Sequence, residues 1–510
     1  MILVRLVGIC TAAVLWLGSG GAAARGLPHR PAATSVRIVW SPCGRRLQCA
    51  RVRVPLDWVH PSAGTISLAL IRYLAGGPGR RIGSMFFNPG GPGASGVEAV
   101  RGDGAALALL GRGRFDVVSW DPRGTGASTR VRCFSSAAAQ SRFWDVNWSI
   151  PTTRGQSLRY VVKATAFARR CAALSGSLLA HIATEDTARD LDYLRRLVGD
   201  RQLTYLGWSY GTFLGQTYAN MFPRRVRAMV LDGAVDPVAF TTSVAASIAG
   251  NIGDTDRVFA ELQALCQRAG SARCALAGHG PVSVRVKGLL SRLRHGPIPA
   301  PSATPSRLTY GDLLLDLYAA MGNPAAWPAL AANLERAARG DGSPLEAEAG
   351  HARPGFQSAL VSATALQCAD KPAPRVGPSA WPQVIGRLTR ISRTSGPVNG
   401  WWLWAPCAAW PARSAERYTG PWNAHTTTPI LVVGTRFDPN TQFANAQRVA
   451  RRLGNAALLT HDGYGHVSVS DPSACVIRAT GTYLVEKIAP PKGTVCTSDR
   501  QPFDPQFGQP

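Results

Sequence analysis

The stretch Tyr205-Leu206-Gly207-Trp208-Ser209-Tyr210-Gly211-Thr212 decides the fold of this chain. An apolar run at 203–206 feeds it and a helix-compatible run at 213–222 follows it, so a strand leads through a Gly-x-Ser-x-Gly turn into a helix. Glycine is needed on both sides of the serine, because a Cβ there would collide with the adjoining strand or helix. The turn predicts that Ser209 is a nucleophile exposed at a strand end. Alone the motif is weak, so the surrounding chain has to support it.

The rest of the chain alternates between short apolar runs and helical patterns. Such runs, ending in glycine-rich turns, are typical of buried parallel strands. We expect antiparallel strands at 38–58 and 66–73, parallel strands at 83–87, 115–120, 203–206, 228–231, 430–433 and 457–459, and a helix at 187–197. This pattern predicts an α/β fold with a mostly parallel, doubly wound sheet.

One interval breaks the alternation. Residues 238–428 show mainly Ala/Leu/Arg helical patterns, and we interpret them as a large helical cap inserted into the sheet domain. The interval is not a linker, because it carries too many large rings to leave in water, among them Trp327, Trp381, Trp401, Trp402, Trp404 and Trp410. The expected organisation is a signal peptide at 1–24, a first core part at 25–237, the cap at 238–428, a second core part at 429–496 and a disordered tail at 497–510.

The first 24 residues have the pattern of a secretory leader. Arg5 precedes an apolar core at 6–17, and Ala22-Ala23-Ala24 resembles a cleavage site. The apolar core is too short to span a bilayer comfortably, although an uncleaved anchor is the alternative. We therefore expect export from the cytoplasm.

The charge is strongly basic but scattered. The chain of 510 residues has a formal net charge of +26, with 45% apolar and 17% charged residues. Basic residues occur singly or in pairs, with no long run and no aromatic-interleaved basic helix, which argues against nucleic acid as a partner. A solvated arginine-rich surface is the simpler interpretation, and attraction to anionic cell-envelope polymers is secondary.

Ten cysteines follow the leader, an even number that fits disulfides in an exported protein. No C-x₂-C pair and no nearby histidine cluster supports zinc instead. The sequence cannot choose rigorously among the pairings, but sequential neighbours close short loops. On that ground we expect Cys43–Cys49, Cys133–Cys171, Cys266–Cys274, Cys368–Cys407 and Cys475–Cys496.

A second glycine-rich stretch follows an early strand, at Asn88-Pro89-Gly90-Gly91-Pro92-Gly93. It reads equally as an ordinary loop. Acyl transfer, however, needs two backbone N–H donors aimed at the developing oxyanion, and glycines let main chain approach that closely. We expect these donors to be Gly91 and Tyr210, the residue after the nucleophile.

The acid and the base follow the last two strands. Asp438 ends the apolar run at 430–433, and His466 follows the strand at 457–459. Asp438 alone is as easily a helix N-cap. His461 is the competing base, but it lies too close to the strand end, whereas Gly463 and Gly465 give His466 a loop long enough to reach back. The order Ser209, Asp438, His466 is that of an α/β hydrolase.

Several motifs together resemble a known family. They are Asn88-Pro-Gly-Gly-Pro-Gly, Asp121-Pro-Arg-Gly-Thr-Gly, Gly207-Trp-Ser-Tyr-Gly-Thr, Leu231-Asp-Gly-Ala-Val-Asp-Pro, Asp438-Pro-Asn-Thr and Gly463-Tyr-Gly-His. Over nearly the whole chain after the leader, the sequence resembles the secreted tripeptidyl aminopeptidases of actinobacteria, relatives of the proline iminopeptidases. Pro89 stands where proline iminopeptidases usually have a histidine, which disfavours single-proline release. The resemblance implies a serine peptidase that releases short peptides from free N-termini through an acyl-enzyme, without metal or other cofactor.

Two other functions use the same residues differently. A secreted carboxylesterase or lipase would share Ser209, His466 and Asp438, and an envelope-binding protein would carry them without using them. For an exopeptidase, the substrate ammonium needs a carboxylate partner. The cap has few acids, and we expect Asp370, two residues from Cys368, to be that anchor; a structural salt bridge to a cap arginine is the alternative.

Overall fold

The computed structural model describes residues 37–144, 150–349, 354–372, 376–410, 412, 414 and 416–507. The predicted leader at 1–24 therefore lies outside the described residues. None of the described helices is both long and apolar enough to cross a bilayer.

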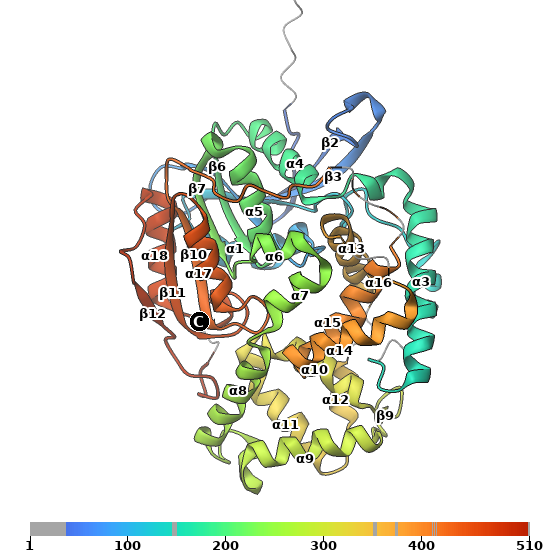
Figure 1. The fold of residues 1–510 in the computed structure, drawn as a ribbon. Helices are drawn as coiled ribbons and strands as arrows, with labels where there is room; N and C mark the ends of the chain where they lie inside the picture. Colours follow the sequence, from blue (N-terminus) through green and yellow to red (C-terminus); the bar gives the residue numbers. More distant parts are fainter. Residues whose placement is uncertain are drawn as a thin grey trace, which may run out of the picture. The chain divides into compact units, whose positions relative to one another are not determined.

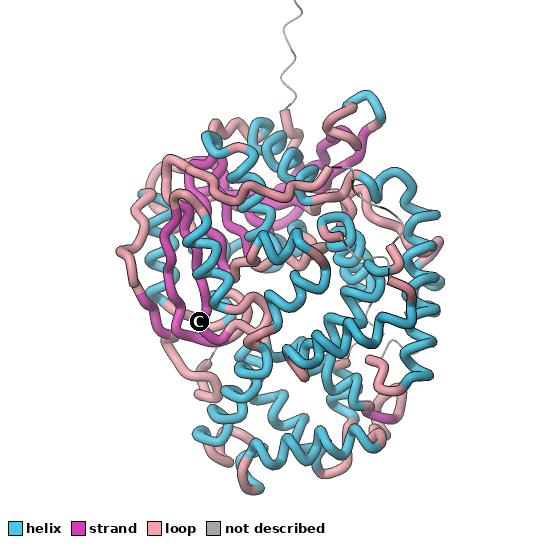
Figure 2. The backbone as a smooth tube through the Cα atoms, viewed as in Figure 1, coloured by secondary structure: helices cyan, strands magenta, loops and turns pink. Residues whose placement is uncertain are grey.

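The described residues form a ten-stranded sheet in the order β1-β2-β3-β5-β4-β6-β7-β10-β11-β12. The strands β1 to β3 and the β3–β5 pair are antiparallel, and every pair from β5 to β12 is parallel. This confirms the predicted mostly parallel sheet (Figure 2). The strands are β1 Ser41–Gly44, β2 Leu47–Pro55, β3 Thr65–Tyr73, β4 Gly83–Asn88, β5 Phe115–Trp120, β6 Leu203–Trp208, β7 Val226–Asp232, β10 Ile430–Phe437, β11 Ala456–Tyr464 and β12 Val495–Thr497.

Helices cover both faces of the sheet, so its central strands are buried on both sides. The covering helices are α1 Gly96–Leu110, α4 Thr184–Leu197, α5 Tyr210–Met221, α17 Phe443–Arg452 and α18 Ala474–Glu486. Along β7, Ala228 and Val230 pack in the cluster that contains α1 and α18, while Met229 and Leu231 pack in the cluster that contains α4 and α5. This alternation follows from the two-residue period of a strand. It explains why these strands read as continuous apolar runs.

The predicted cap is helical and has its own apolar cluster, which includes Leu262, Leu293, Leu317 and Leu334. Of the tryptophans named above, Trp402 is half-buried and the other five are buried. A short antiparallel pair of strands, β8 Ile298–Pro299 and β9 Arg307–Leu308, interrupts the helices. Figure 1 shows most of these helices below and to the right of the sheet. They are α6 Pro237–Thr242, α7 Val244–Ile252, α8 Thr255–Ala269, α9 Val282–His295, α10 Tyr310–Met321, α11 Trp327–Ala338, α12 Ser343–Glu348, α13 Pro354–Asp370, α14 Trp381–Ile391, α15 Ser395–Asn399 and α16 Ala405–Ala408.

A second segment of the chain also packs with the cap, although the sequence analysis placed it in the core part at 25–237. Between β5 and α4 the chain forms α2 Ala137–Trp144 and α3 Arg154–Ser175. The helix α3 packs on the cap: the Tyr160 ring lies 5.1 Å from the Trp401 ring, and Phe167 lies 6.3 Å from Trp410. Aromatic side chains from α3 therefore add to the cap's packing.

The C-terminal segment corrects the predicted disordered tail at 497–510. After β12 the chain continues in turns to residue 507. Phe503 is buried among the cap's apolar residues, and Asp504 pairs with Arg273 at 2.7 Å. A single large apolar ring anchors this segment, since leaving it in water would cost free energy.

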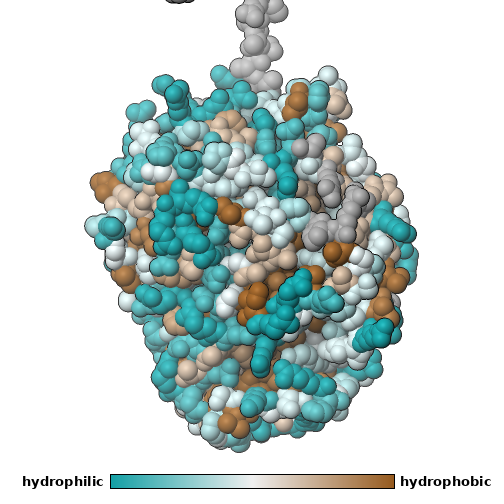
Figure 3. Space-filling model, in the orientation of Figure 1, coloured by the Kyte–Doolittle hydropathy of each residue, from teal (hydrophilic) through white to brown (hydrophobic). Residues whose placement is uncertain are grey.

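The ten cysteines form five disulfides in the described structure. They join Cys43 to Cys49, Cys133 to Cys171, Cys266 to Cys274, Cys368 to Cys407 and Cys475 to Cys496. These are the pairs of sequential neighbours that the sequence analysis expected. On the face shown in Figure 3, hydrophilic and hydrophobic side chains are interspersed, as on an ordinary solvated surface.

Candidate active site

Ser209 lies in the turn between β6 and α5. Its backbone has φ 55° and ψ −123°, a region that costs a side-chain-bearing residue about 1–3 kcal/mol. A Cβ on Gly207 would lie 2.5 Å from the Gly211 carbonyl oxygen, and one on Gly211 would lie 2.6 Å from the Asn88 carbonyl oxygen. Both glycines are therefore required, for the steric reason expected from the turn.

Asp438 lies in the loop after β10 and is fully buried. Its Oδ1 accepts the backbone N–H groups of Asn440 and Thr441, each at 2.8 Å, and its Oδ2 accepts the Thr441 hydroxyl at 2.8 Å. Burial opposes the charge on this carboxyl group, but the adjacent His466 and these donors outweigh burial and lower its pKa. Asp438 is therefore ionised and fixed in place. The sequence analysis did not identify the Thr441 hydroxyl as part of this site, because its position also suits a helix cap.

His466 lies in the loop after β11 and faces Asp438. Its Nδ1 is 3.0 Å from Oδ1 and 3.1 Å from Oδ2 of Asp438. Because a carboxylate only accepts hydrogen bonds, Nδ1 carries the proton and Nε2 is left as a base. Burial opposes a positive charge on the ring, but the Asp438 carboxylate outweighs burial and raises the pKa of His466.

Two further contacts hold the loop that carries His466. The His466 backbone N–H donates to the carbonyl oxygen of Gly322, in the cap, at 2.8 Å. The Ser468 backbone N–H and hydroxyl both donate to Asp232, at 3.1 and 2.6 Å. The histidine is thus fixed both from the cap and from the end of β7.

Ser209 and His466 line one cavity of about 310 Å³. The cap forms much of its wall, with Ser247, Ile248, Asn251, Tyr318, Asn399 and Leu403. The arrangement brings a serine hydroxyl, a basic histidine nitrogen and a covered substrate space together. That combination suits nucleophilic attack on a carbonyl carbon in a partly dry site.

The glycine loop after β4 reaches the same cavity. Gly91 and Tyr210 both line it, and a Cβ on Gly90 would lie 2.4 Å from the Trp208 carbonyl oxygen and 2.9 Å from Ser209 Cβ. Gly90 and Gly91 have φ values of 92° and 104°, which favour glycine. The loop therefore packs closely against the backbone at Trp208 and Ser209.

Asp370 is placed differently from its predicted role. It is fully enclosed and is not among the residues that line the cavity. Its Oδ1 accepts the Thr184 backbone N–H at 2.8 Å, and its Oδ2 accepts the Thr184 hydroxyl at 2.6 Å. Both oxygens thus bind Thr184, the first residue of α4, and burial raises the pKa of this carboxyl group to about 6. Asp370 therefore does not face the cavity, whereas the next residue in the chain, Lys371, does.

Gln367, in the last turn of α13, and Lys371, directly after that helix, line the cavity, and the sequence analysis singled out neither. Lys371 gave no local signal, because its burial depends on packing against distant helices. The competing base, His461, is fully buried and does not line the cavity. Burial lowers the pKa of His461 to about 4, so the structure keeps it neutral.

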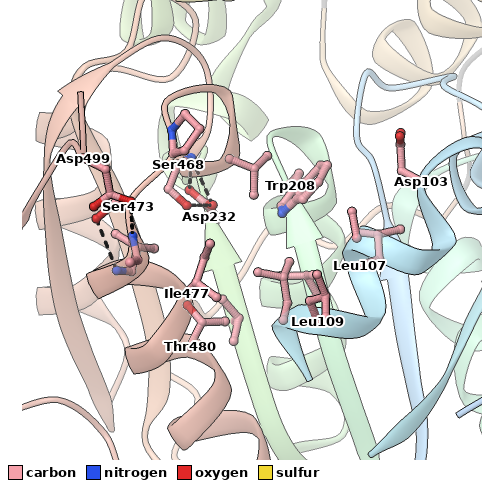
Figure 4. Close-up of a pocket in the computed structure, with 18 of the residues that line it drawn as sticks. Asp103, Leu107, Leu109, Trp208, Asp232, Ser468, Ser473, Ile477, Thr480 and Asp499 are labelled. Carbon is pink, nitrogen blue, oxygen red and sulfur yellow. Dashed lines mark hydrogen bonds between the residues drawn. The ribbon is translucent and has the colours of Figure 1, made fainter. Parts of the chain in front are cut away.

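A larger cavity of about 710 Å³ lies between α1 and α18. Figure 4 shows Asp232 and Ser468 on its wall near Trp208. No residue lines both this cavity and the one at Ser209. The larger cavity is therefore lined by Asp232 and Ser468, which hold the His466 loop, and not by Ser209 or His466. Over the described part of the chain, no group of three or more His, Cys, Asp or Glu side chains could hold a metal ion.

Comparison with known proteins adds family evidence. Residues 83–261 match the model of the alpha/beta hydrolase fold, and residues 397–496 match that of the TAP-like protein. The chain is 32% identical over 489 residues to "Serine protease Hip1" of Mycobacterium tuberculosis, covering 90% of this chain and 91% of that one. It is 29% identical to "Tripeptidyl aminopeptidase" of Streptomyces lividans, covering 91% and 87%. It is 34% identical to "Carboxylesterase B" of M. tuberculosis, covering 89% and 86%.

Proposed function

The chain belongs to the TAP-like family of α/β hydrolases, and from that premise we propose that it is a serine peptidase that acts through Ser209, His466 and Asp438. The observation that carries the proposal is the His466 Nδ1–Asp438 pair, at 3.0 Å, facing the same cavity as a serine held in a strained turn.

The mechanism follows from these positions. His466 Nε2 takes the proton of Ser209 Oγ as Oγ attacks the substrate carbonyl carbon, and Asp438 stabilises the imidazolium that forms. The N–H groups of Gly91 and Tyr210 bind the oxyanion of the tetrahedral intermediate. His466 then gives the proton to the leaving amine, which leaves an acyl-enzyme. A water molecule, deprotonated by His466, hydrolyses that ester and regenerates Ser209.

The substrates are short peptides. A cavity of about 310 Å³ walled by cap helices suits a short extended segment better than a folded protein. The narrower proposal, release of tripeptides from free N-termini, rests on relatives named tripeptidyl aminopeptidase. It needs an ammonium partner other than Asp370, whose two oxygens bind Thr184.

A carboxylesterase is the second candidate, favoured by the relative of that name at 34% identity. Ester and amide hydrolysis use the same nucleophile, base and oxyanion donors, so the difference lies in the cap's contacts with substrate. We also propose that the protein works outside the cytoplasm, because five disulfides are typical of oxidising compartments. Weak attraction of the basic surface to anionic envelope polymers is compatible with that location.

A substrate panel tests the proposal. It contains chromogenic tripeptide and dipeptide anilides, each with a free and with an acetylated N-terminus, beside short acyl esters. We expect the wild type to cleave anilides, with the free tripeptides preferred, and the Ser209→Ala variant to cleave none. Hydrolysis of the esters without any anilide would favour the carboxylesterase. Equal rates on free and acetylated peptides would refute N-terminal recognition while leaving the peptidase proposal intact.

A further inference from the structure

The cavity at Ser209 has an unusual charge balance for an enzyme that binds a substrate ammonium. Its described lining contains one lysine, Lys371, and one histidine, His466, but no aspartate or glutamate. Asp438 and Asp370 lie behind these two residues and do not line the space. A bound ligand therefore meets one ammonium group, that of Lys371, and otherwise neutral groups.

Lys371 is held in a fixed position. It is about 4% exposed, its Nζ donates to Gln367 Oε1 at 2.6 Å, and it lies 3.8 Å from the centre of the Phe240 ring. Gln367 and Phe240 line the same cavity. Since an ammonium group has three N–H donors, the bond to Gln367 leaves donors for a ligand.

The neighbouring carboxylate does not pair with this ammonium. Asp370 directs both of its oxygens to Thr184, so it acts on Lys371 only through space. Burial lowers the pKa of Lys371 to about 7, and the charge of Asp370 only partly opposes that effect. A buried cation without a directly bonded anion is costly, and an anionic ligand would remove that cost.

The position of Lys371 relates it to the acyl part of the substrate. Its aromatic neighbour, Phe240, lies 6.1 Å from the Tyr210 ring, and Tyr210 directly follows the nucleophile. His466, which must protonate the leaving group, comes from the loop after β11 instead. The leaving group must therefore lie beside His466, and the Tyr210 side of Ser209 is left for the acyl part.

We propose that Lys371 binds a carboxylate in the acyl part of the substrate, which in a peptide is the side chain of an Asp or Glu residue close to the cleaved bond. The inference rests on the proposed nucleophile Ser209, but it holds for a peptidase and for an esterase. It names acidic acyl groups as the substrate class, which the fold alone does not determine.

Two esters that differ by one group test it: 4-nitrophenyl butyrate and 4-nitrophenyl hemisuccinate, in which a carboxylate replaces the terminal methyl group. The readout is the ratio of the kcat/KM values, hemisuccinate over butyrate. We expect Lys371→Met to lower this ratio at least tenfold. Lys371→Arg, which keeps the positive charge, should retain a higher ratio than Lys371→Met. Lys492→Met, the same change at an exposed site, should leave the ratio unchanged. A ratio within twofold of the wild type in Lys371→Met would overturn the proposal.

A measurement on the wild type covers the case in which Lys371→Met does not fold. Glutaramate and its neutral analogue valeramide, in which a methyl group replaces the carboxylate, are compared as protectants of Ser209 against a fluorophosphonate probe. We expect glutaramate to protect at a concentration at least tenfold lower, and equal protection would overturn the inference. Failure of the peptidase proposal would appear separately, as absent anilide cleavage with the ester ratio still dependent on Lys371. If the wild type cleaved neither ester, the assignment of Ser209 as the nucleophile would be the part that fails.

Discussion

Asp438 illustrates how a single residue's role depends on opposing effects. Full burial disfavours its charge, yet His466 and the hydrogen-bond donors of Asn440 and Thr441 outweigh that effect and lower its pKa. An amide in its place would keep the shape of the side chain but lose the charge. It could also donate to His466, which would favour the tautomer with the proton on Nε2, and this tautomer is not a base toward Ser209.

We therefore predict that Asp438→Asn lowers kcat/KM on a neutral ester by several orders of magnitude, about 10⁴-fold if the well-studied triad behaviour transfers. The wild-type rate should fall with acid as His466 becomes protonated, at a pH above the usual value for histidine, because Asp438 raises its pKa. In Asp438→Asn that fall should move to lower pH. The measurement is kcat/KM from pH 4 to 9.

Asp462→Asn is the matched control, since this carboxylate lies on the same strand as the start of the His466 loop but is exposed and pairs with Arg436. Its profile should match the wild type. Full activity of Asp438→Asn at neutral pH would remove Asp438 from the catalytic group.

Asp370 shows where reasoning from residues in sequence stops. The apolar run and the nearby cysteine correctly indicated a buried, rigid carboxylate. Its partner, however, is Thr184, 186 positions away, and only the folded chain shows that Thr184 engages both oxygens. The sequence analysis missed Lys371 for the same reason, because the sequence of α13 and the residue after it does not show which side chains reach the cavity.

At the scale of elements, the sequence predicted the positions of the parallel strands except β12 Val495–Thr497, which was not predicted. The predicted strands contain short apolar runs, and that signal is local. The helix α3 has a clear helical pattern too, but its position in the cap depends on rings such as Trp401 and Trp410 far along the chain. Local patterns therefore defined the elements, whereas the partner of each helix was set by distant contacts.

Arg123, in the loop after β5, connects several elements. It is fully buried, its Nε and one Nη each donate to Asp190 of α4 at 2.7 Å, and the other Nη donates to the carbonyl oxygens of Leu56 and His181. We predict that Arg123→Met lowers the free energy of unfolding by about 3–5 kcal/mol, because it leaves a buried carboxylate unpaired. Urea denaturation measures the change.

Arg130→Met, the same change at an exposed position in the same loop, should change the free energy of unfolding by less than about 0.5 kcal/mol. If Arg123→Met proved as stable as Arg130→Met, the ion pair would not be the link between β2, α4 and the loop after β5.

At the scale of the whole molecule, disulfides and the C-terminal segment connect helices and loops that are separate elements along the chain. The disulfide Cys133–Cys171 ties the loop after β5 to α3, and Cys368–Cys407 ties α13 to α16. Phe503 brings the segment after β12 onto the cap. Phe503 and Phe507 were the large apolar residues in the sequence that argued against a disordered tail. Only the folded chain shows that Phe503 packs on the cap.

We predict that the protein without its leader contains no free thiol and loses stability on reduction, by about 2–4 kcal/mol for each bridge. Thiol titration of the denatured, unreduced protein gives the first result, and denaturation with and without reductant gives the second. Two or more reactive thiols in the unreduced protein would contradict the five bridges.

The central claim is that Ser209 is a nucleophile activated by His466. The most direct test is to label the purified protein with a fluorophosphonate and to locate the modified residue by mass spectrometry. We predict one phosphonylated serine, Ser209, with no labelling of Ser209→Ala and labelling slowed at least 100-fold in His466→Ala. Labelling at another residue, or an unchanged labelling rate in His466→Ala, would contradict the account.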